Sequence, residues 1–359
     1  MKAAVLHEVG ESKIEVRDDV SSIPTPAHSV KVKIHATGVC HSDLHAIDGT
    51  VPQMLPAILG HEGAGEVIEV GSLVEDLAIG DHVIVNWLPS CGKCRYCLNS
   101  QPYLCMVYTL KSFTEHNFLA GDTPAFGMAG TGTFAEEVVL PRPGVVKIPN
   151  DVPYDVASLI GCGIMTGVGA AINTAKVTPG SKVLVIGCGG VGISVIQGAR
   201  IAGAAEIVAV DMLDKKLEWA KQFGATHAVT PDGLSALMGE LTEWTGFDYV
   251  FDVVGRAATI RQGYDNTARG GKLTIVGVGP ATEQVTFSPF ELLFSDKTIL
   301  GSVYGGGHPE RDFPRLIALW KAGRLDLEGM ITRRISIEEI NDAFDAMKAG
   351  EVIRQVIEL

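Results

Sequence analysis

The residues with the clearest chemistry are four cysteines within fifteen positions, Cys91, Cys94, Cys97 and Cys105. Their spacing, C-x2-C-x2-C-x7-C, lets four thiolates close around one tetrahedral zinc ion, and a closed set of four protein ligands is typical of a structural site. An iron–sulfur cluster is a second interpretation, although the fourth cysteine comes too late for the ferredoxin run. A zinc module that binds nucleic acid, and unligated buried cysteines, are further alternatives.

A glycine-rich segment over residues 187–192 fits the pattern G-x-G-x-x-G. Alone this pattern is weak, but here it follows an apolar run of strand length, opens a helical stretch, and is followed 19 residues after Gly192 by Asp211. Such glycines allow a tight turn and the close approach of a pyrophosphate to a helix N-terminus. Asp211 is expected to bind the ribose 2′-hydroxyl and to repel a 2′-phosphate, which favours NAD over NADP. The alternative is a strand–turn–helix without a ligand.

Further metal-ligating residue types are scattered. Cys40 and His41 begin one short polar stretch, His61 and Glu62 lie in another, and Cys162 stands alone between two glycines. Spacing alone does not link these residues, because one cysteine, one histidine and a distant cysteine are individually ordinary.

The elements that must position these residues fall into two kinds. Apolar and polar residues alternate over 30–35, and short apolar runs lie at 66–71 and 81–85, so the first half reads as an antiparallel barrel with long loops. From residue 182 on, buried strands are expected at 182–187, 207–211, 228–230, 249–252 and 272–276, with helices at 191–202 and 213–223 between them. This alternation predicts a doubly wound parallel sheet. Two helical stretches, 312–322 and 337–349, and a short strand end the chain.

Composition narrows the class of protein. Of the 359 residues 46% are hydrophobic, which is enough for two cores. With 29 basic and 42 acidic residues the net charge is −13, unfavourable for binding a nucleic acid backbone. Seven cysteines, an odd number in a large chain, favour metal ligation over a disulfide scaffold. The most apolar stretch, 183–210, is broken by glycines and charges, and no leader is evident, so we expect no membrane span and a cytoplasmic location.

Taken together, these motifs resemble the zinc-dependent, medium-chain alcohol dehydrogenases over essentially the whole chain. The resemblance is to the class III-like branch that includes aryl-alcohol and thiol-dependent formaldehyde dehydrogenases. It rests on residues 38–43, Gly60-His61-Glu62-Gly63 with the glycines that follow, the four-cysteine lobe, Gly161-Cys162-Gly163 and the glycine-rich segment. It implies a GroES-like catalytic domain over 1–155 and 300–359, with a structural zinc lobe at about 88–110. A Rossmann domain over 156–299 is expected between the two parts.

The resemblance also carries over ligands and catalytic roles. Cys40, His61 and Cys162 match the three protein ligands of a catalytic zinc, a ligand set known for alcohol dehydrogenase. Asp43 matches the carboxylate that orients the ligating histidine, and Glu62 one that can exchange into the coordination shell.

Two zinc ions and NAD are the cofactors implied. Zinc stabilises the alkoxide from which hydride passes to NAD. The alcohol proton leaves by a relay from Ser42 through the cofactor ribose to His45, whose ordinary pKa suits exchange with water.

Cofactor contacts implied by the resemblance are His41, Thr166, Gly187, Gly189, Gly190, Val191, Gly192, Asp211, Lys216, Val276, Val278 and Arg354. As isolated residues, the basic ones would be read as solvated surface charges and the valines as sheet core.

Val51, Trp87, Leu104, Val278 and Val303 match positions that line the substrate channel. All five are apolar, which favours a medium-sized primary, allylic or aromatic alcohol, oxidised reversibly to its aldehyde. A dehydrogenase of formaldehyde adducts with glutathione or mycothiol is the main alternative. A catalytically silent structural or regulatory relative is an alternative of another class, disfavoured by the intact ligand set. A homodimer or homotetramer is expected, with no nucleic acid or membrane partner.

Overall fold

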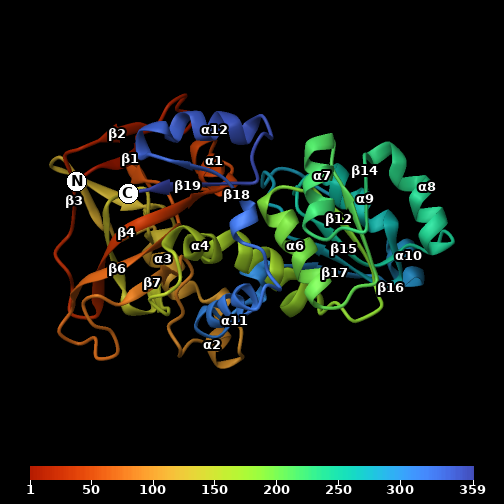
Figure 1. The fold of residues 1–359 in the computed structure, drawn as a ribbon, viewed down its shortest axis with the longest axis horizontal. Coiled ribbons are helices and arrows are strands. Elements are labelled where there is room, and N and C mark those ends of the chain that lie inside the picture. The colour runs from red at the N-terminus through yellow and green to blue at the C-terminus, as the bar shows by residue number, and fades with distance from the viewer. The chain divides into compact units, whose positions relative to one another are not determined.

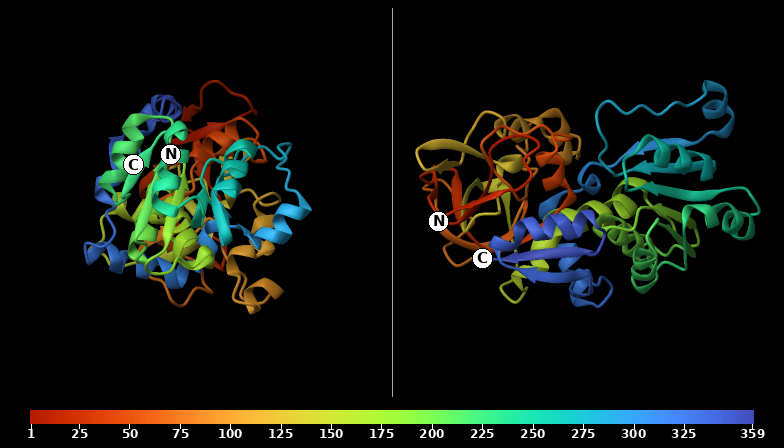
Figure 2. Two further views of the ribbon diagram at one scale, coloured as in Figure 1. Left: turned by 90° about the vertical axis from the view of Figure 1, so that its right-hand side faces the viewer. Right: turned by 90° about the horizontal axis from the view of Figure 1, so that it is seen from above.

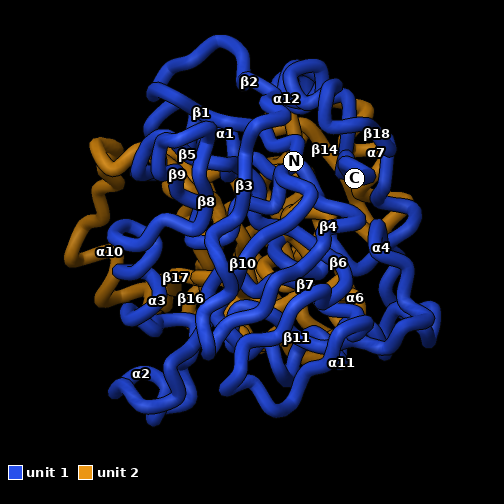
Figure 3. Tube along the Cα trace, turned by 90° about the vertical axis from the view of Figure 1, so that its left-hand side faces the viewer, with its two compact units in different colours: residues 1–162, 308–359 blue, residues 163–307 orange.

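The computed structural model describes residues 1–359, and the chain divides into two compact units (Figure 3). Unit 1 comprises residues 1–162 and 308–359, and unit 2 comprises residues 163–307. The sequence placed these limits a few residues earlier, after 155 and after 299. The fold class agrees with the sequence prediction, since one unit is built on mostly antiparallel sheets and the other on a parallel sheet.

Unit 1 is built on two mostly antiparallel sheets (Figure 1). The first has the order β2-β1-β5-β9-β8-β3 and is formed by β1 (Ala3–Leu6), β2 (Glu15–Arg17), β3 (Val20–Ser22), β5 (Ala57–Ile58), β8 (Phe118–Ala120) and β9 (Thr123–Gly127). The second has the order β11-β7-β6-β4-β19-β18, with β10 also paired to β4. It is formed by β4 (Ser29–Val39), β6 (Glu62–Val70), β7 (His82–Val85), β10 (Glu137–Pro141), β11 (Val145–Lys147), β18 (Ile331–Ile335) and β19 (Arg354–Glu358).

The alternating pattern over 30–35 explains how β4 sits in this unit. Val30, Val32 and Ile34 are fully buried in a core shared by both sheets, whereas Lys33 points to solvent. Burial of one face is what a two-residue period requires. The helices of unit 1 are α1 (His41–Ile47), α2 (Arg95–Leu98), α3 (Met106–Lys111), α4 (Tyr154–Leu159), α11 (Pro309–Lys321) and α12 (Ile340–Lys348).

Unit 2 is a parallel sheet with the order β14-β13-β12-β15-β16-β17. Its strands are β12 (Lys182–Ile186), β13 (Glu206–Val210), β14 (His227–Val229), β15 (Phe247–Asp252), β16 (Thr267–Ile275) and β17 (Thr298–Gly301). Its helices are α5 (Met165–Gly169), α6 (Gly190–Ile201), α7 (Asp214–Gln222), α8 (Pro231–Thr242), α9 (Ala257–Asn266) and α10 (Pro289–Ser295), and Figure 2 shows helices on both sides of the strands. The strand order reverses between β12 and β15, which is where ligands bind in open α/β sheets.

The predicted alternation of strands and helices is therefore present, but one long helical run has no clear signal in the sequence. Residues 154–175 form α4, a π-helical stretch at Ile160–Ile164, α5 and a second π-helical stretch. By length and hydropathy alone this run could cross a membrane, yet 83% of its most apolar window is buried inside the protein, as in a core helix. A helix that is apolar on every side and rich in glycine lacks the 3.6-residue period that identifies amphipathic helices.

The first residue of α4 is held on the second sheet of unit 1 by an aromatic sandwich. The Tyr154 ring lies 4.5 Å from the ring of His35 on β4 and 4.5 Å from the ring of His82 on β7. Strand β6 runs between β4 and β7, so the two imidazoles stand two strand spacings apart with the phenol between them. Burial and nearby Lys33 and His82 lower the pKa of His35, and Glu66 only partly opposes this.

This lowered pKa predicts how stability depends on pH. Folding favours the neutral imidazole of His35. Its contribution to the free energy of unfolding is therefore complete above the unfolded pKa of about 6.5, and it falls as the pH drops below that value. We expect the melting temperature of a His35→Asn variant to change less between pH 6.5 and 5.5 than that of the natural chain. Replacing the exposed His116 in the same way serves as the control, and equal slopes in all three proteins would contradict the prediction.

Candidate active site

Four metal-ligating side chains from three parts of unit 1 meet in a buried cluster. Cys40, His61, Glu62 and Cys162 each offer a ligand atom within 4.8 Å of the others. None of the four is more than 7% exposed. Cys40 follows β4, His61 and Glu62 lie at the start of β6, and Cys162 lies in the π-helical stretch after α4. The structure thus brings together residues that spacing alone could not connect.

Asp43, at the third position of α1, fixes two of these ligands. Its Oδ2 accepts the backbone N–H of Cys40 at 2.9 Å, which caps the helix. Its Oδ1 accepts the N–H of Gly60 at 3.1 Å and lies 3.4 Å from Nδ1 of His61. The fully buried carboxylate therefore holds Cys40 by its backbone and faces the ring of His61.

The electrostatics of the cluster favour a bound cation. Burial opposes a charged imidazole, but the Asp43 carboxylate and the Cys40 sulfur outweigh it and raise the pKa of His61 to about 10. The Cys162 sulfur, against the effect of burial, holds the pKa of Cys40 well below its usual range. Neither ring nitrogen of His61 has a hydrogen-bond partner of good geometry. Thiolate, imidazole and carboxylate donors around one point fit a zinc ion.

Glu62 has a cationic partner of its own. Its carboxylate is paired with the guanidinium of Arg354, the first residue of β19, and both side chains are almost completely buried. The pair joins positions 292 residues apart in the sequence. In this arrangement the Arg354 side chain, expected to contact the cofactor pyrophosphate, is directed to Glu62.

The second cluster is the four-cysteine lobe. The Sγ atoms of Cys91, Cys94, Cys97 and Cys105 lie within 4.8 Å of one another, and none forms a disulfide. Cys94 directly precedes α2 and Cys105 directly precedes α3, so two of the four ligands lie at the N-termini of short helices. The backbone N–H of Cys94 donates to Sγ of Cys91, and that of Cys91 donates to Sγ of Cys105, each at 3.3 Å.

Backbone donors stabilise thiolate in this lobe. The N–H of Lys93, against the opposing effect of burial, lowers the pKa of Cys91 to about 6. Burial raises the pKa of Cys97 to about 12. Four thiolates so close together need a cation to offset their mutual repulsion, and four sulfur donors close the coordination shell of a tetrahedral zinc.

The glycine-rich turn of unit 2 has the geometry of a dinucleotide site. Gly187 follows β12 with a φ of +95°, and a Cβ on Gly192 would lie 1.9 Å from the Gly187 carbonyl oxygen. A Cβ on Gly189 would meet nothing within 4 Å, so the backbone is open to a ligand at the residue that caps α6. Tight turn, open approach and close packing are the three roles that glycines have in this motif.

Asp211 follows β13 and stands against this turn. Its carboxylate accepts the N–H of Cys188 at 2.8 Å and that of Leu213 at 3.1 Å. The remaining cysteine, Cys188, is buried with its sulfur 3.6 Å from the Val210 carbonyl, and burial raises the pKa of its thiol. Cys188 therefore packs in the core and offers no ligand.

The other predicted residues lie in both units. Ser42 Oγ is 3.6 Å from Sγ of Cys40, and the ring of Trp87 stands edge-on to His61 with 6.2 Å between centroids. The His45 ring is 3.7 Å from Asp48 and 5.3 Å from the exposed His41 ring. In unit 1, Val51 and Leu104 are half-buried. In unit 2, Thr166, Val191, Lys216 and Val276 are half-buried, and Val278 and Val303 are exposed.

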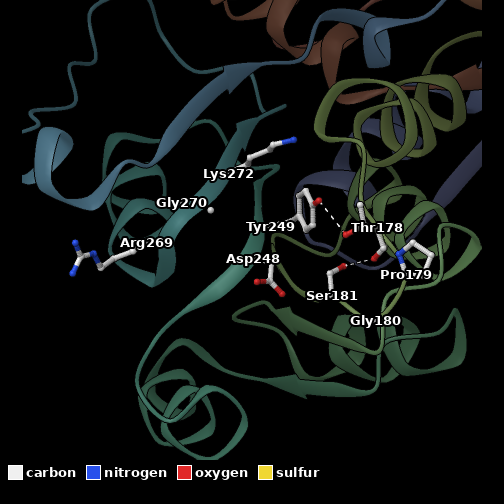
Figure 4. Close-up of a pocket in the computed structure, with 10 residues that line it drawn as sticks. Thr178, Pro179, Gly180, Ser181, Asp248, Tyr249, Arg269, Gly270 and Lys272 are labelled. Atoms are coloured by element: carbon white, nitrogen blue, oxygen red, sulfur yellow. Dashed lines mark hydrogen bonds between the residues drawn. The ribbon is translucent and has the colours of Figure 1, made fainter.

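A pocket of about 350 Å³ lies elsewhere in unit 2, lined by residues 178–181, 248–249 and 269–272 (Figure 4). These residues stand at the amino ends of β12 and β15 and in the first half of β16. The dinucleotide turn lies at the carboxyl end of β12, whereas this pocket lies at the amino ends of the strands, on the opposite side of the sheet. In Figure 4 the Tyr249 hydroxyl points to Thr178, whereas Arg269 points away from the other lining side chains.

Two features of the sites were missed in the sequence. One is the Glu62–Arg354 pair, for which a single sequence gives no signal. The other is Asp252, a fully buried carboxylate at the end of β15. A signal existed for Asp252, because an aspartate that ends a buried parallel strand has the same placement as Asp211.

A GroES-like unit with a cysteine–histidine–glutamate cluster, a four-thiolate lobe and a dinucleotide turn defines a zinc-dependent dehydrogenase. Comparison with known families agrees. Residues 26–150 match the alcohol dehydrogenase GroES-like domain, and residues 190–322 match the zinc-binding dehydrogenase family. The chain belongs to the zinc-dependent medium-chain alcohol dehydrogenase family, and its cofactors are two zinc ions and a nicotinamide dinucleotide, as the sequence predicted.

Relatives and solved structures resemble the chain over nearly its full length. It is 38% identical to the S-(hydroxymethyl)glutathione dehydrogenase of Paracoccus denitrificans, over 99% of both chains. It is 41% identical to alcohol dehydrogenase B of Mycobacterium tuberculosis, over 91% of this chain and 90% of that protein. The crystal structure of benzyl alcohol dehydrogenase from Acinetobacter calcoaceticus superposes with a TM-score of 0.93 at 32% identity, over 100% of this chain and 99% of that one.

Because the lobe and the buried cluster share no ligands, we expect that one zinc ion can be removed while the other is retained. We expect about two zinc ions per chain, one per cluster. Cys105→Ala should remove one and destabilise the protein by about 3 kcal/mol, which lowers the melting temperature by several degrees. Metal analysis together with thermal unfolding provides the measurement. Cys188→Ala is the matched control and should retain both ions, while an unchanged melting temperature in Cys105→Ala with one ion lost would rule out a structural role.

Proposed function

We propose that this chain oxidises a medium-sized primary, allylic or aromatic alcohol to its aldehyde, reversibly and with NAD as the hydride acceptor. Cys40, His61 and Cys162 would hold the catalytic zinc, with Glu62 beside it, and Cys91, Cys94, Cys97 and Cys105 the structural zinc. The observation that carries the proposal is the buried cluster of Cys40, His61, Glu62 and Cys162, which has the donors for a catalytic zinc.

The surroundings of the cluster favour an apolar substrate. Trp87 presents an aromatic ring beside His61, so an aromatic or allylic group next to the metal would bury apolar surface. The structurally similar Acinetobacter protein is named for benzyl alcohol, which supports the same class of substrate. Val51 and Leu104 in unit 1, and Val278 and Val303 in unit 2, are the further lining residues that we propose.

In this mechanism the protein orients the reacting groups and removes one proton. When bound, zinc supplies Lewis acidity that makes the alcohol hydroxyl more acidic and polarises the carbonyl in the reverse direction. Ser42, whose hydroxyl is next to the Cys40 sulfur, would accept the alcohol proton and give up its own hydroxyl proton, and His45, at the surface end of the relay, would release a proton to water. Asp43 keeps His61 in the orientation that a ligand needs.

The cofactor contacts that we propose extend from the glycine-rich turn. The backbone at Gly187, Gly189, Gly190 and Gly192 receives the pyrophosphate, with His41 and Arg354 as basic contacts. Asp211 and Lys216 bind the adenosine ribose, and Thr166, Val191, Val276 and Val278 enclose the nicotinamide. Arg354 could reach a phosphate only by loosening its pair with Glu62.

A thiol-dependent formaldehyde dehydrogenase is the second candidate. The relative from Paracoccus is named for S-(hydroxymethyl)glutathione, which is an adduct of formaldehyde and a thiol. Such an adduct carries charged groups and needs polar or cationic partners in the pocket. Val51 is apolar and offers none. Lys111, the last residue of α3, is a possible cationic partner, but its ammonium group is already paired with Glu115 at 2.9 Å, which favours the simple alcohol.

The two candidates are separated by steady-state NAD reduction. We expect turnover of benzyl and cinnamyl alcohol without added thiol, and no gain when formaldehyde is supplied with glutathione or mycothiol. Cys162→Ala should abolish turnover, because a zinc ligand is lost, while NADH binding stays within about twofold. Turnover that needs the thiol would favour the second candidate. No turnover of any alcohol or adduct by the zinc-loaded chain would favour a catalytically silent relative.

The choice between NAD and NADP is tested at Asp211. The Cys188 N–H donates to Oδ2 of Asp211 and the Leu213 N–H to Oδ1, so Asp211→Asn keeps an acceptor for one of them and loses the charge that repels a 2′-phosphate. We expect the ratio of kcat/KM for NAD to that for NADP to fall by on the order of tenfold or more, and the melting temperature to fall by only a few degrees, because one of the two hydrogen bonds is kept. Asp211→Gly should relax the preference as well and should also destabilise the turn. An unaltered ratio in both variants would refute the role of Asp211.

We further propose a homodimer or homotetramer in the cytoplasm, without a nucleic acid or membrane partner. In unit 2, β17 is the outermost strand of the sheet, and α10 exposes Phe290, Leu293 and Phe294, at 70%, 73% and 58% exposure. An open sheet edge next to exposed aromatic and aliphatic side chains supports association between subunits.

A further inference from the structure

Two loops interlock at the carboxyl ends of neighbouring strands in unit 2. One comprises residues 253–256, after β15, and the other residues 276–279, after β16. A Cβ on Gly279 would lie 1.9 Å from the Gly255 carbonyl oxygen, and one on Gly277 would lie 2.3 Å from the Gly255 nitrogen. Gly255 itself has a φ of +81°. The loops are therefore packed backbone against backbone, and a shift of one requires a shift of the other.

Asp252 ties both loops to the sheet. Its carboxylate Oδ2 accepts the N–H of Gly255 at 2.8 Å, which closes the first loop. Its main-chain carbonyl accepts the N–H groups of Val276 at 2.8 Å and Gly277 at 3.0 Å, which turns the second loop.

The side chain of Asp252 is unfavourable for the stability of the fold. It is fully buried, and its Oδ1 has no hydrogen-bond partner. Burial raises the pKa of this carboxyl, opposed by the Thr259 hydroxyl and by the N–H groups of Gly255 and Val254. A buried polar atom without a partner destabilises a fold, so an apolar side chain would suit this strand end better for stability alone.

The interlocked loops border the dinucleotide turn. A Cβ on Gly187, the first glycine of the fingerprint, would lie 2.8 Å from Cγ2 of Val254. Val254 and Val278, one in each loop, are 39% and 49% exposed. An acidic group that is unfavourable for stability thus organises the backbone beside the cofactor turn, at the point where the strand order reverses.

We propose that Asp252 is a positioning residue that sets the geometry of the turn at 276–278 and thereby the affinity for the nicotinamide half of the cofactor. The inference rests on the proposed function, in which Val276 and Val278 lie at the nicotinamide. Asp252 acts through the two loops and does not itself touch the cofactor. The adenosine half, held by the glycine-rich turn and Asp211, is independent of it.

The test compares two ligands that differ only in the nicotinamide. Dissociation constants for NADH and for ADP-ribose are measured on the zinc-loaded chain. In Asp252→Val, a β-branched side chain fills the strand end without an acceptor. We expect the Kd of NADH to rise about tenfold, as for one lost hydrogen bond, and that of ADP-ribose to stay within twofold. The melting temperature should not fall by more than a few degrees, since the unpaired carboxylate oxygen is removed as well.

Two further variants complete the design. Asp252→Asn retains an acceptor for Gly255 and should restore most of the NADH affinity. Asp248→Asn changes the exposed aspartate at the other end of the same strand and should affect neither ligand. An equal loss for NADH and ADP-ribose, or no loss in Asp252→Val, would overturn the inference. If Asp252→Val does not fold, the same two dissociation constants are measured on Asp252→Ala, which also lacks the acceptor for the Gly255 N–H, and an unchanged Kd of NADH would overturn the inference. Failure of the natural chain to bind NADH would refute the proposed function instead.

Discussion

The arrangement of the buried cluster depends on one carboxylate. Asp43 ends the turn from β4 into α1, accepts the N–H of Gly60 just before β6, and faces the ring of His61. Strands β4 and β6 pair in one sheet, and Asp43 fixes the residues at their adjoining ends, so that Cys40 and His61 lie close together. Because the carboxylate is fully buried, each of its interactions takes place in a medium of low polarity, where it is strong and its loss is costly.

Unit 2 also has acidic side chains that accept hydrogen bonds from backbone N–H groups at the ends of strands. Asp211 follows β13 and accepts two backbone N–H groups, and Asp252 ends β15 and accepts one while its carbonyl accepts two more. A carboxylate can accept several hydrogen bonds at once, which suits it to the end of a strand, where backbone donors lose their partners in the sheet. In all three places an acidic side chain gives a loop a defined shape through hydrogen bonds to its backbone.

What could be predicted from the sequence was local. The alternation in β4, the apolar strands of unit 2 and the glycine-rich turn each carry their signal within a few residues. The four cysteines of the lobe also lie within one short stretch, so their spacing is visible in the sequence. The link between Cys40, His61 and Cys162 needed the resemblance to a family, because no periodicity joins three such distant positions. The Glu62–Arg354 pair was inaccessible for the same reason, and the helical run 154–175 was hidden by its lack of a polar face.

The two clusters differ in how much chain must fold before they can form. The ligands of the lobe come from the single stretch 91–105, so a nascent chain can complete that site early, as soon as this stretch is free to fold. The buried cluster needs residues 40, 61 and 162, and Glu62 pairs with residue 354 only when nearly the whole chain has been made. Closing such long loops costs more entropy and slows folding. Topology alone thus favours completion of the thiolate lobe before completion of the buried cluster.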